Sequence, residues 1–399
     1  MIHIERPFIK TDAEYATLTA YITIDDNRQP VWFKVEKKYS SYLCDERGDA
    51  FLILVLNYAM RHGHDIVSEA PIGEYLYYNI DRYLIDALAD YNPHFRRTRI
   101  NAPVDSSSLS CARAVGTGIS CGVDSMYVLA EELKDKFPLH KLTHVMFNNV
   151  GSHGEGVHGR QLFQSKKQRP QEIANNLNLE LIFGDSNAMD VVVQNHFFTH
   201  TYSSMFAVFC LQKLFSVYYY ASSASKYHEF SLVDDGKRGS GSYEFLSLRC
   251  FTTDKLTILS QGEGKSRLEK LRTVVKYHPA YQYIHVCLKA DNNCGKCEKC
   301  VRTLLGIDAL GELDNFKESF DIDYYRKNRS WYIQQMMYHR ADGKHDYLDL
   351  YDALKKDVTF SMRFKTILYR LQSVLKDAIR PHKGLYRYLK SLYESHNNG

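Results

Sequence analysis

The stretch Gly118-Ile119-Ser120-Cys121-Gly122-Val123-Asp124-Ser125 decides the fold of this chain. It follows residues 112–118, which predict a short β-strand, and it precedes residues 126–137, whose apolar side chains repeat at the spacing of one helix face. Such a loop of small residues lets backbone N–H groups approach an anion, and the helix adds the positive end of its dipole. The stretch therefore predicts a phosphate site, with an ordinary strand-to-helix turn as the alternative. It has no Walker lysine, which disfavours a P-loop nucleoside triphosphatase.

The segments that follow alternate between strand and helix patterns. Strands are expected at 142–147, 179–183 and 217–221, and helices at 170–177 and 201–214. Alternation of this kind is typical of an α/β fold, a parallel sheet with helices on both faces.

The flanking regions have different patterns. Residues 1–105 predict an α+β domain: a hairpin over 17–24 and 31–35, a helix over 50–60 that ends at Gly63, and a second helix over 76–88. The polar run 105–108 is the expected linker, and past Gly311 the chain is helical and rich in Tyr, Lys and Arg. We therefore expect three domains: 1–105, 106–312 and a C-terminal basic helical region, 313–399.

Four of the nine cysteines form a cluster with the spacing C-x6-C-x2-C-x2-C: Cys287, Cys294, Cys297 and Cys300. Four thiolates fill the tetrahedral shell of a structural zinc ion, and Gly295 allows the tight turn of a zinc knuckle. The cluster predicts Zn²⁺, with an iron–sulfur cluster or redox-active thiols as alternatives.

Composition excludes several classes of protein. With 399 residues, 44% hydrophobic and 25% charged, the chain is globular and not disordered, collagen-like or coiled-coil. The opening MIHIERPFIK is charged where a secretory signal is apolar, and the apolar stretch 205–221 is too short and too polar to cross a bilayer. We expect a cytoplasmic protein without a membrane partner.

The loop after the first strand closely resembles the PP-loop of the N-type ATP pyrophosphatases, whose pattern is S-G-G-x-D-S. The resemblance implies that ATP and Mg²⁺ bind along the loop, at Ser120, Cys121, Gly122, Val123, Asp124 and Ser125. Cys121 departs from the pattern, which has glycine there. A side chain at that position has a cost if the backbone needs a positive φ.

Together, the loop and the cysteine cluster resemble the 7-cyano-7-deazaguanine synthase family over residues 112–312. The resemblance implies an enzyme that splits ATP into AMP and pyrophosphate to activate the carboxylate of a 7-deazaguanine. Ammonia or an amine would then displace AMP to give an amide, and with ammonia the amide would be converted in a later step into a nitrile. The extra flanking regions look like those of enlarged relatives in bacterial anti-phage systems, some of which attach a deazaguanine to a protein, so a protein acceptor is also implied.

Further candidates lie at the carboxyl ends of the predicted strands. Lys226 is expected to be catalytic together with Asp124 and Ser125, and Asn148 is expected to read the adenine, with Asn149 as its neighbour. Weaker candidates, each with a structural alternative, are Ser222, Ser223, Arg249, Arg267, His196 and His200. His153, His158 and Arg160 lie in a glycine-rich segment that could form a mobile lid.

Two other functions remain open. One is a tRNA-modifying enzyme that uses its basic tail to bind phosphates, since the sequence from Phe360 onward contains eight basic residues and only two acidic ones. The other is a non-catalytic nucleotide-binding subunit. Leu368, Leu371 and Leu375 lie on one face of that tail, which predicts a docking surface or a helix packed on its own domain.

Overall fold

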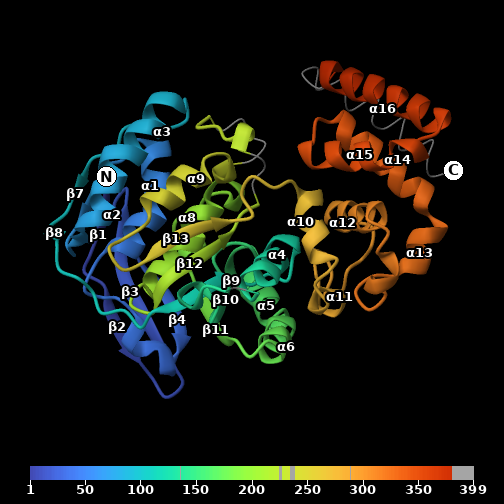
Figure 1. Ribbon diagram of the computed structural model, residues 1–399. Helices are drawn as coiled ribbons and strands as arrows, with labels where there is room; N and C mark the ends of the chain where they lie inside the picture. The colour runs from blue at the N-terminus through green and yellow to red at the C-terminus, as the bar shows by residue number, and fades with distance from the viewer. Residues whose placement is uncertain (135, 224–226, 234–238, 288, 380–399) are drawn as a thin grey trace. The chain divides into compact units, whose positions relative to one another are not determined.

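The computed structural model describes residues 1–134, 136–223, 227–233, 239–287 and 289–379 (Figure 1). The chain divides into two compact units, Met1–His285 and Val286–Gly399. The single boundary differs from the expected boundaries near residues 105 and 312. The expected N-terminal domain shares a sheet with the loop region, and the cysteine cluster belongs with the C-terminal helices.

The described part of the first unit contains an eleven-stranded sheet in the order β13-β12-β9-β10-β11-β4-β3-β1-β5-β7, with β2 paired to β3. Its strands are β1 (Ile2–Ile4), β2 (Phe8–Thr11), β3 (Tyr15–Ile24), β4 (Asn27–Glu36), β5 (Ile66–Ser68), β7 (Ile100–Asn101), β9 (Ala114–Gly118), β10 (His144–Asn148), β11 (Glu180–Ser186), β12 (Phe215–Ala221) and β13 (Thr257–Gln261). Two short strands, β6 (Ile72–Gly73) and β8 (Val104–Asp105), pair separately.

The segment β13-β12-β9-β10-β11 is parallel throughout. In chain order the five strands run 3-2-1-4-5 from β11 to β13, so the order reverses between β9 and β12. In an open α/β sheet, ligands bind outside the carboxyl ends of the strands at such a reversal. The predicted α/β class and parallel sheet are confirmed, and the loop 118–125 lies at the reversal point.

The remaining strands are mainly antiparallel and start with the predicted hairpin of β3 and β4. Asp25 and Asp26 form its two-residue turn, with φ values of 49° and 68°. Positive φ at both positions is the requirement of a type I′ turn, whose twist matches that of the strands. The hairpin joins the parallel strands where β4 pairs with β11, Phe33 opposite Ser186. The Asn187 side chain extends this junction by bonding to Trp32 N and Pro30 O, both at 2.8 Å.

Helices cover both faces of the sheet in the first unit (Figure 1). They are α1 (Asp49–His62), α2 (Glu74–Asn79), α3 (Ile85–Tyr91), α4 (Val123–Glu132), α5 (Gly156–Ser165), α6 (Gln168–Asn176), α7 (Ala188–Val191), α8 (His196–Cys210), α9 (Glu244–Cys250), α10 (Arg267–Val274) and α11 (Pro279–Tyr283). A π-helical turn, Ile80–Leu84, joins α2 to α3. The predicted helix 50–60 is α1, and Gly63 ends it in the left-handed conformation.

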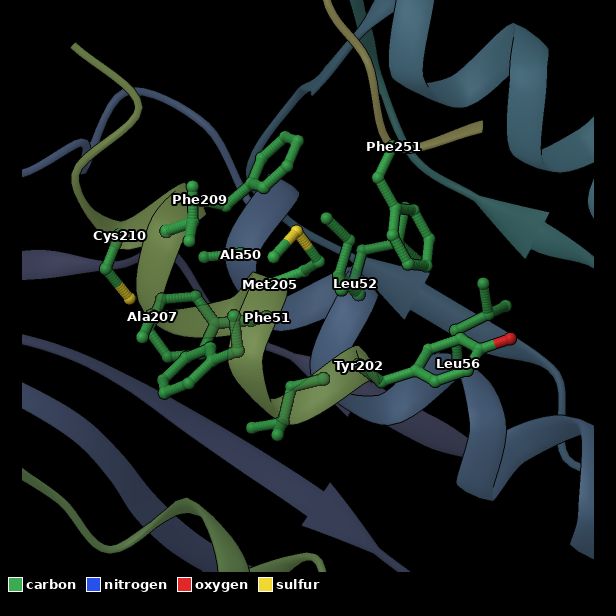
Figure 2. Close-up of a cluster of buried hydrophobic side chains, with 14 of the residues drawn as sticks. Ala50, Phe51, Leu52, Leu56, Tyr202, Met205, Ala207, Phe209, Cys210 and Phe251 are labelled. Carbon is green, nitrogen blue, oxygen red and sulfur yellow. The ribbon is translucent and has the colours of Figure 1, made fainter. Parts of the chain in front are cut away.

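One large apolar core lies between the sheet and the pair α1 and α8. Figure 2 shows the two helices facing each other, with Phe51 and Leu52 from α1 against Met205 and Phe209 from α8. Met146 of β10 faces this core, whereas its neighbours Val145 and Phe147 are buried outside it. Because successive strand residues point to opposite faces, the parallel strands are covered on both sides.

The described part of the second unit is helical. Its helices are α12 (Glu298–Ala309), α13 (Ile322–Lys327), α14 (Arg329–Ala341), α15 (Leu348–Leu354) and α16 (Phe360–Ile379). The cysteine cluster precedes and enters α12, and α14 contacts α12, α13, α15 and α16. Within the described residues, none of the helices combines the length and apolarity needed to cross a bilayer.

Candidate functional site

The loop between β9 and α4 is built around its two serines. Ser120 Oγ accepts a hydrogen bond from Gly122 N at 3.3 Å and lies 3.3 Å from Ser125 Oγ. Ser125 Oγ donates to Gly122 O at 3.1 Å. Gly122 caps α4 with extended backbone angles and without a side-chain cap, and Val123 begins the helix. The loop therefore presents the amino end of a ten-residue helix at the sheet's reversal point, the arrangement that favours an anion.

Cys121 has the left-handed conformation, with a φ of 58°. A positive φ at this position is what a glycine in the PP-loop pattern would provide, and an L-residue adopts it at a cost of roughly 1–2 kcal/mol. The backbone is held from both sides, because Ile119 N bonds to Met146 O and His285 N bonds to Cys121 O, each at 2.8 Å.

The Cys121 side chain is buried, and burial raises the pKa of its thiol to about 12. A thiol with this pKa is protonated at neutral pH, whereas a cysteine nucleophile must be a thiolate. The structure therefore gives Cys121 a packing role and no activated sulfur.

Asp124 points to two cations that both come from α10. Arg267 Nη1 donates to Asp124 Oδ2 at 2.9 Å, and Lys270 Nζ donates to Asp124 Oδ1 at 3.1 Å. The Lys270 side chain is almost fully buried, and the Arg267 side chain is mostly buried. Buried charges need partners, so the carboxylate fixes both cations beside the loop.

Lys270 also connects the loop to the end of β12, because its ammonium donates to Ser222 O. The buried Ser222 hydroxyl donates in turn to Glu244 Oε1 of α9. The site thus combines residues that follow β9 and β12 with residues of α9 and α10, all in the first unit.

Arg267 was a weak candidate from the sequence, and Lys270 was not predicted. A signal for both was present: Ser266 and Glu269 have the spacing of a capping box, and the structure shows its two hydrogen bonds, Glu269 N to Ser266 Oγ and Ser266 N to Glu269 Oε2. A helix that starts at Arg267 places Arg267 and Lys270 on one face, three residues apart.

Other predicted residues lie at the ends of neighbouring strands. Asn148 ends β10, and its Oδ1 is buried without a hydrogen-bond partner among the described residues. This oxygen is packed against Gly184 of β11, where a Cβ would collide with it, and so it does not face an open site. Asn149 has a structural role instead, since its Nδ2 donates to Asp185 Oδ1 at 2.9 Å.

The glycine-rich segment 151–159 is partly helical. Helix α5 begins at Gly156, and Asp190 holds its start by accepting from Gly156 N at 2.6 Å and from Arg160 Nη1 at 2.7 Å. His153 packs on Phe147 and Phe163, and burial lowers its pKa to about 4. His158 is exposed.

Two of the remaining candidates, His200 and Ser223, lie beside Gly241 near the carboxyl end of β12. His200 Nδ1 lies 2.8 Å from Tyr220 Oη, and burial with the nearby His196 lowers the pKa of His200 to about 3. Ser223 and Arg249 are exposed. The predicted catalytic residue Lys226 lies outside the described residues.

The four clustered cysteines converge in the second unit, with their sulfur atoms within 4.8 Å of one another. A tetrahedral zinc with Zn–S bonds of about 2.3 Å separates its sulfurs by roughly 3.8 Å. Cys297 Sγ and Cys287 Sγ lie 4.0 Å apart. The donor set and its spacing therefore fit a metal ion such as zinc.

Backbone N–H groups support the cluster. Cys297 N donates to Cys294 Sγ at 3.3 Å, and Lys289 N donates to Cys287 Sγ at 3.4 Å. Burial raises the pKa of Cys294, but such backbone hydrogen bonds outweigh it and lower the pKa to about 7, toward the thiolate that a metal needs. Gly295 makes the turn with a φ of 69°, and its carbonyl accepts from Tyr332 Oη of α14 at 2.8 Å.

Comparison of the chain with protein-family models, with curated proteins and with solved structures found no match in any of the three.

Proposed function

We propose that the protein is an adenylating enzyme of the PP-loop type, which splits ATP into AMP and pyrophosphate to activate a carboxylate. One observation carries the proposal. The S-x-G-x-D-S loop lies at the reversal point of a 3-2-1-4-5 sheet, with positive φ at Cys121 and two α10 cations fixed beside Asp124. This place combines the hydrogen-bond donors of the loop, the amino end of a helix and fixed positive charge. Together they suit the phosphates of a nucleoside triphosphate.

The residues divide into two roles. Ser120, Gly122 and Ser125 would donate hydrogen bonds to the β- and γ-phosphates and so hold pyrophosphate as an intact leaving group. Asp124 is a positioning residue, because its carboxylate would repel phosphate directly but orients Arg267 and Lys270 toward it. These cations would stabilise the charge that develops as the α–β bond breaks. Magnesium bound to ATP would neutralise phosphate charge when present.

The proposed substrate is the carboxylate of a 7-deazaguanine, with ammonia or an amine as the nucleophile and a protein as a further acceptor. The carboxylate oxygen attacks the α-phosphorus, pyrophosphate leaves, and the resulting acyl-adenylate loses AMP when nitrogen attacks its carbonyl carbon. This substrate rests on the resemblance, together with the cysteine cluster that fits the zinc site. The zinc would hold the fold of the second unit and takes no part in these steps.

The test identifies the products formed from ATP and traces one oxygen atom of the carboxylate substrate. The full chain is incubated with ATP, Mg²⁺, ammonia and 7-carboxy-7-deazaguanine labelled with ¹⁸O in its carboxylate. We expect AMP and pyrophosphate, with one ¹⁸O atom transferred to AMP, because adenylation makes that oxygen part of the phosphate ester. ADP as the substrate-dependent product would refute the proposal.

Variants locate the activity in the described site. Lys270→Met should lower the rate of AMP formation by about 10²–10³-fold, the usual effect of removing one group that stabilises transition-state charge. Asp124→Ala should abolish AMP formation, since it leaves Lys270 buried without its carboxylate partner. Lys265→Met is the matched control, because Lys265 is exposed on the same loop-helix segment. Full activity in Asp124→Ala would show that another site is responsible.

A further inference from the structure

Among the side chains that the structure describes, helix α16 packs one face on its own unit and leaves an apolar face exposed. The packed face lies on α14: Thr366 is buried and its Oγ1 lies 3.0 Å from Gln334 Nε2, while Tyr369 stacks on Tyr338 with ring centroids 4.4 Å apart. Tyr369 Oη also donates to Asp342 Oδ2 at 3.0 Å. This face fixes α16 to its own unit (Figure 1).

The opposite face is more apolar and is exposed. Its side chains form what we call the α16 stripe, and each of them is between 54% and 83% exposed: Phe360, Phe364, Ile367, Leu371 and Val374. Exposure of single apolar residues is ordinary, but five on one helix face form a continuous patch. A helix normally buries its most apolar side, so the stripe requires a cover.

The spacing of the stripe points to what covers it. Its residues are separated by four, three, four and three positions, which is the a/d pattern of a coiled-coil seam. Knobs-into-holes packing needs a partner helix with the same spacing, and α16 of a second copy provides it. We propose that the protein forms a homodimer through the α16 stripe.

The size of the stripe agrees with this partner. It runs for about 21 Å along the helix at a rise of 1.5 Å per residue. Its side chains expose on the order of 600 Å² of apolar surface, the upper end for a monomer. With the residues that flank it, the stripe approaches the roughly 800 Å² that each partner gives to a stable interface.

The flanking charges are compatible with a parallel pair. Arg363 lies on one side of the stripe and Leu368 on the other, at the positions that face each other across a parallel seam. Each Arg363 stem would therefore cover Leu368 of the second copy, and no two like charges would meet. An antiparallel pair would instead bring Arg363 near Arg370 of the second copy.

The experiment measures the dissociation constant of the full-length protein by analytical ultracentrifugation. We expect the wild type to be a dimer at micromolar concentration, and Leu371→Glu to raise the dissociation constant more than about 100-fold, because it places a charge in an apolar seam. Gln372→Glu is the matched control: it adds the same charge to the adjacent exposed residue, off the stripe, and should leave the dimer intact.

Because Leu371 is exposed in a single copy, its substitution should leave the thermal stability of the monomer unchanged. Ile367→Gln, a smaller change at the centre of the stripe, should weaken the dimer in the same direction and serves if Leu371→Glu does not fold. A wild type that stays monomeric up to about 100 µM would overturn the proposal. So would a dimer that both stripe variants leave intact.

Discussion

Cys121 gives a quantitative test of the loop geometry, because its backbone and its side chain act on stability in opposite directions. At a φ of 58°, an L-residue costs roughly 1–2 kcal/mol relative to an ordinary conformation. Glycine avoids this cost but loses about 0.5–1 kcal/mol to the greater freedom of the unfolded chain. Both Cys121→Gly and Cys121→Ala also remove the buried thiol, and with it about 1 kcal/mol of stability from the burial of that group.

These contributions reverse the usual order of glycine and alanine. Cys121→Ala keeps the backbone cost and should be about 1 kcal/mol less stable than the wild type. Cys121→Gly should lie close to the wild type, and so about 0.5–1 kcal/mol above Cys121→Ala. Cys121→Gly should also keep AMP formation, since glycine adopts the same loop conformation without cost.

The assay can be confined to the first unit. Trp32 lies in β4 of that unit, and the other tryptophan, Trp331, lies in the second, so a Trp331→Phe background makes tryptophan fluorescence report the first unit alone. Urea unfolding of the two variants in this background then gives their free energies of unfolding. Equal stability of Cys121→Ala and Cys121→Gly would limit the cost of the positive φ to the roughly 0.5–1 kcal/mol that glycine loses in the unfolded chain, and would refute the larger cost of roughly 1–2 kcal/mol.

Two further predictions concern the metal cluster and a buried histidine. Elemental analysis should find about one zinc ion per chain. Cys297→Ser should lose the zinc and unfold the second unit, whereas Cys111→Ser, which lies outside the cluster, should do neither. Iron with a visible absorption band would contradict the assignment of zinc. Burial lowers the pKa of His153 to about 4 from the ordinary value of 6.5, so the stability that its neutral form contributes is present above pH 6.5 and is lost as the pH falls toward 4. The first unit should therefore lose about 2 kcal/mol through His153 between pH 7 and pH 5. His153→Phe should remove this loss while the exposed control His158→Gln should not, and equal pH profiles for the two variants would contradict the assigned pKa.

Local patterns predicted much of the fold. A continuous apolar run and a glycine stop predicted α1, and strict alternation predicted β3 and β4. Boundaries were less certain: the helix expected to reach Phe137 ends at Glu132, because Phe137 is exposed and does not continue the buried face. Strand β13 was missed, since a five-residue strand with two polar residues at its end has little periodic signal.

The candidate site was predictable where its residues are neighbours in the chain, as in the loop and the cysteine cluster. The capping box made the helix that carries Lys270 predictable, but nothing in the sequence links Lys270 to Asp124, 146 residues away. Their pairing depends on the packing of α10 on α4, which is a tertiary contact. The pairing of β4 with β11 was not predictable for the same reason, since the sequence pattern of a strand does not specify which strand it pairs with.

The pairing of β4 with β11 also determines how the protein can be divided. A fragment that began at the polar run after Asp105 would leave β11 as an outer strand, with the N–H and C=O groups that now face Lys34 and Phe33 open to solvent. It would also lose α1 and so uncover the apolar side of α8. Unpaired strand edges beside exposed apolar surface promote association with other chains. We therefore expect such a fragment to aggregate when expressed alone, so that residues 1–105 act as an obligatory partner of the region that carries the loop 118–125, within one folding unit.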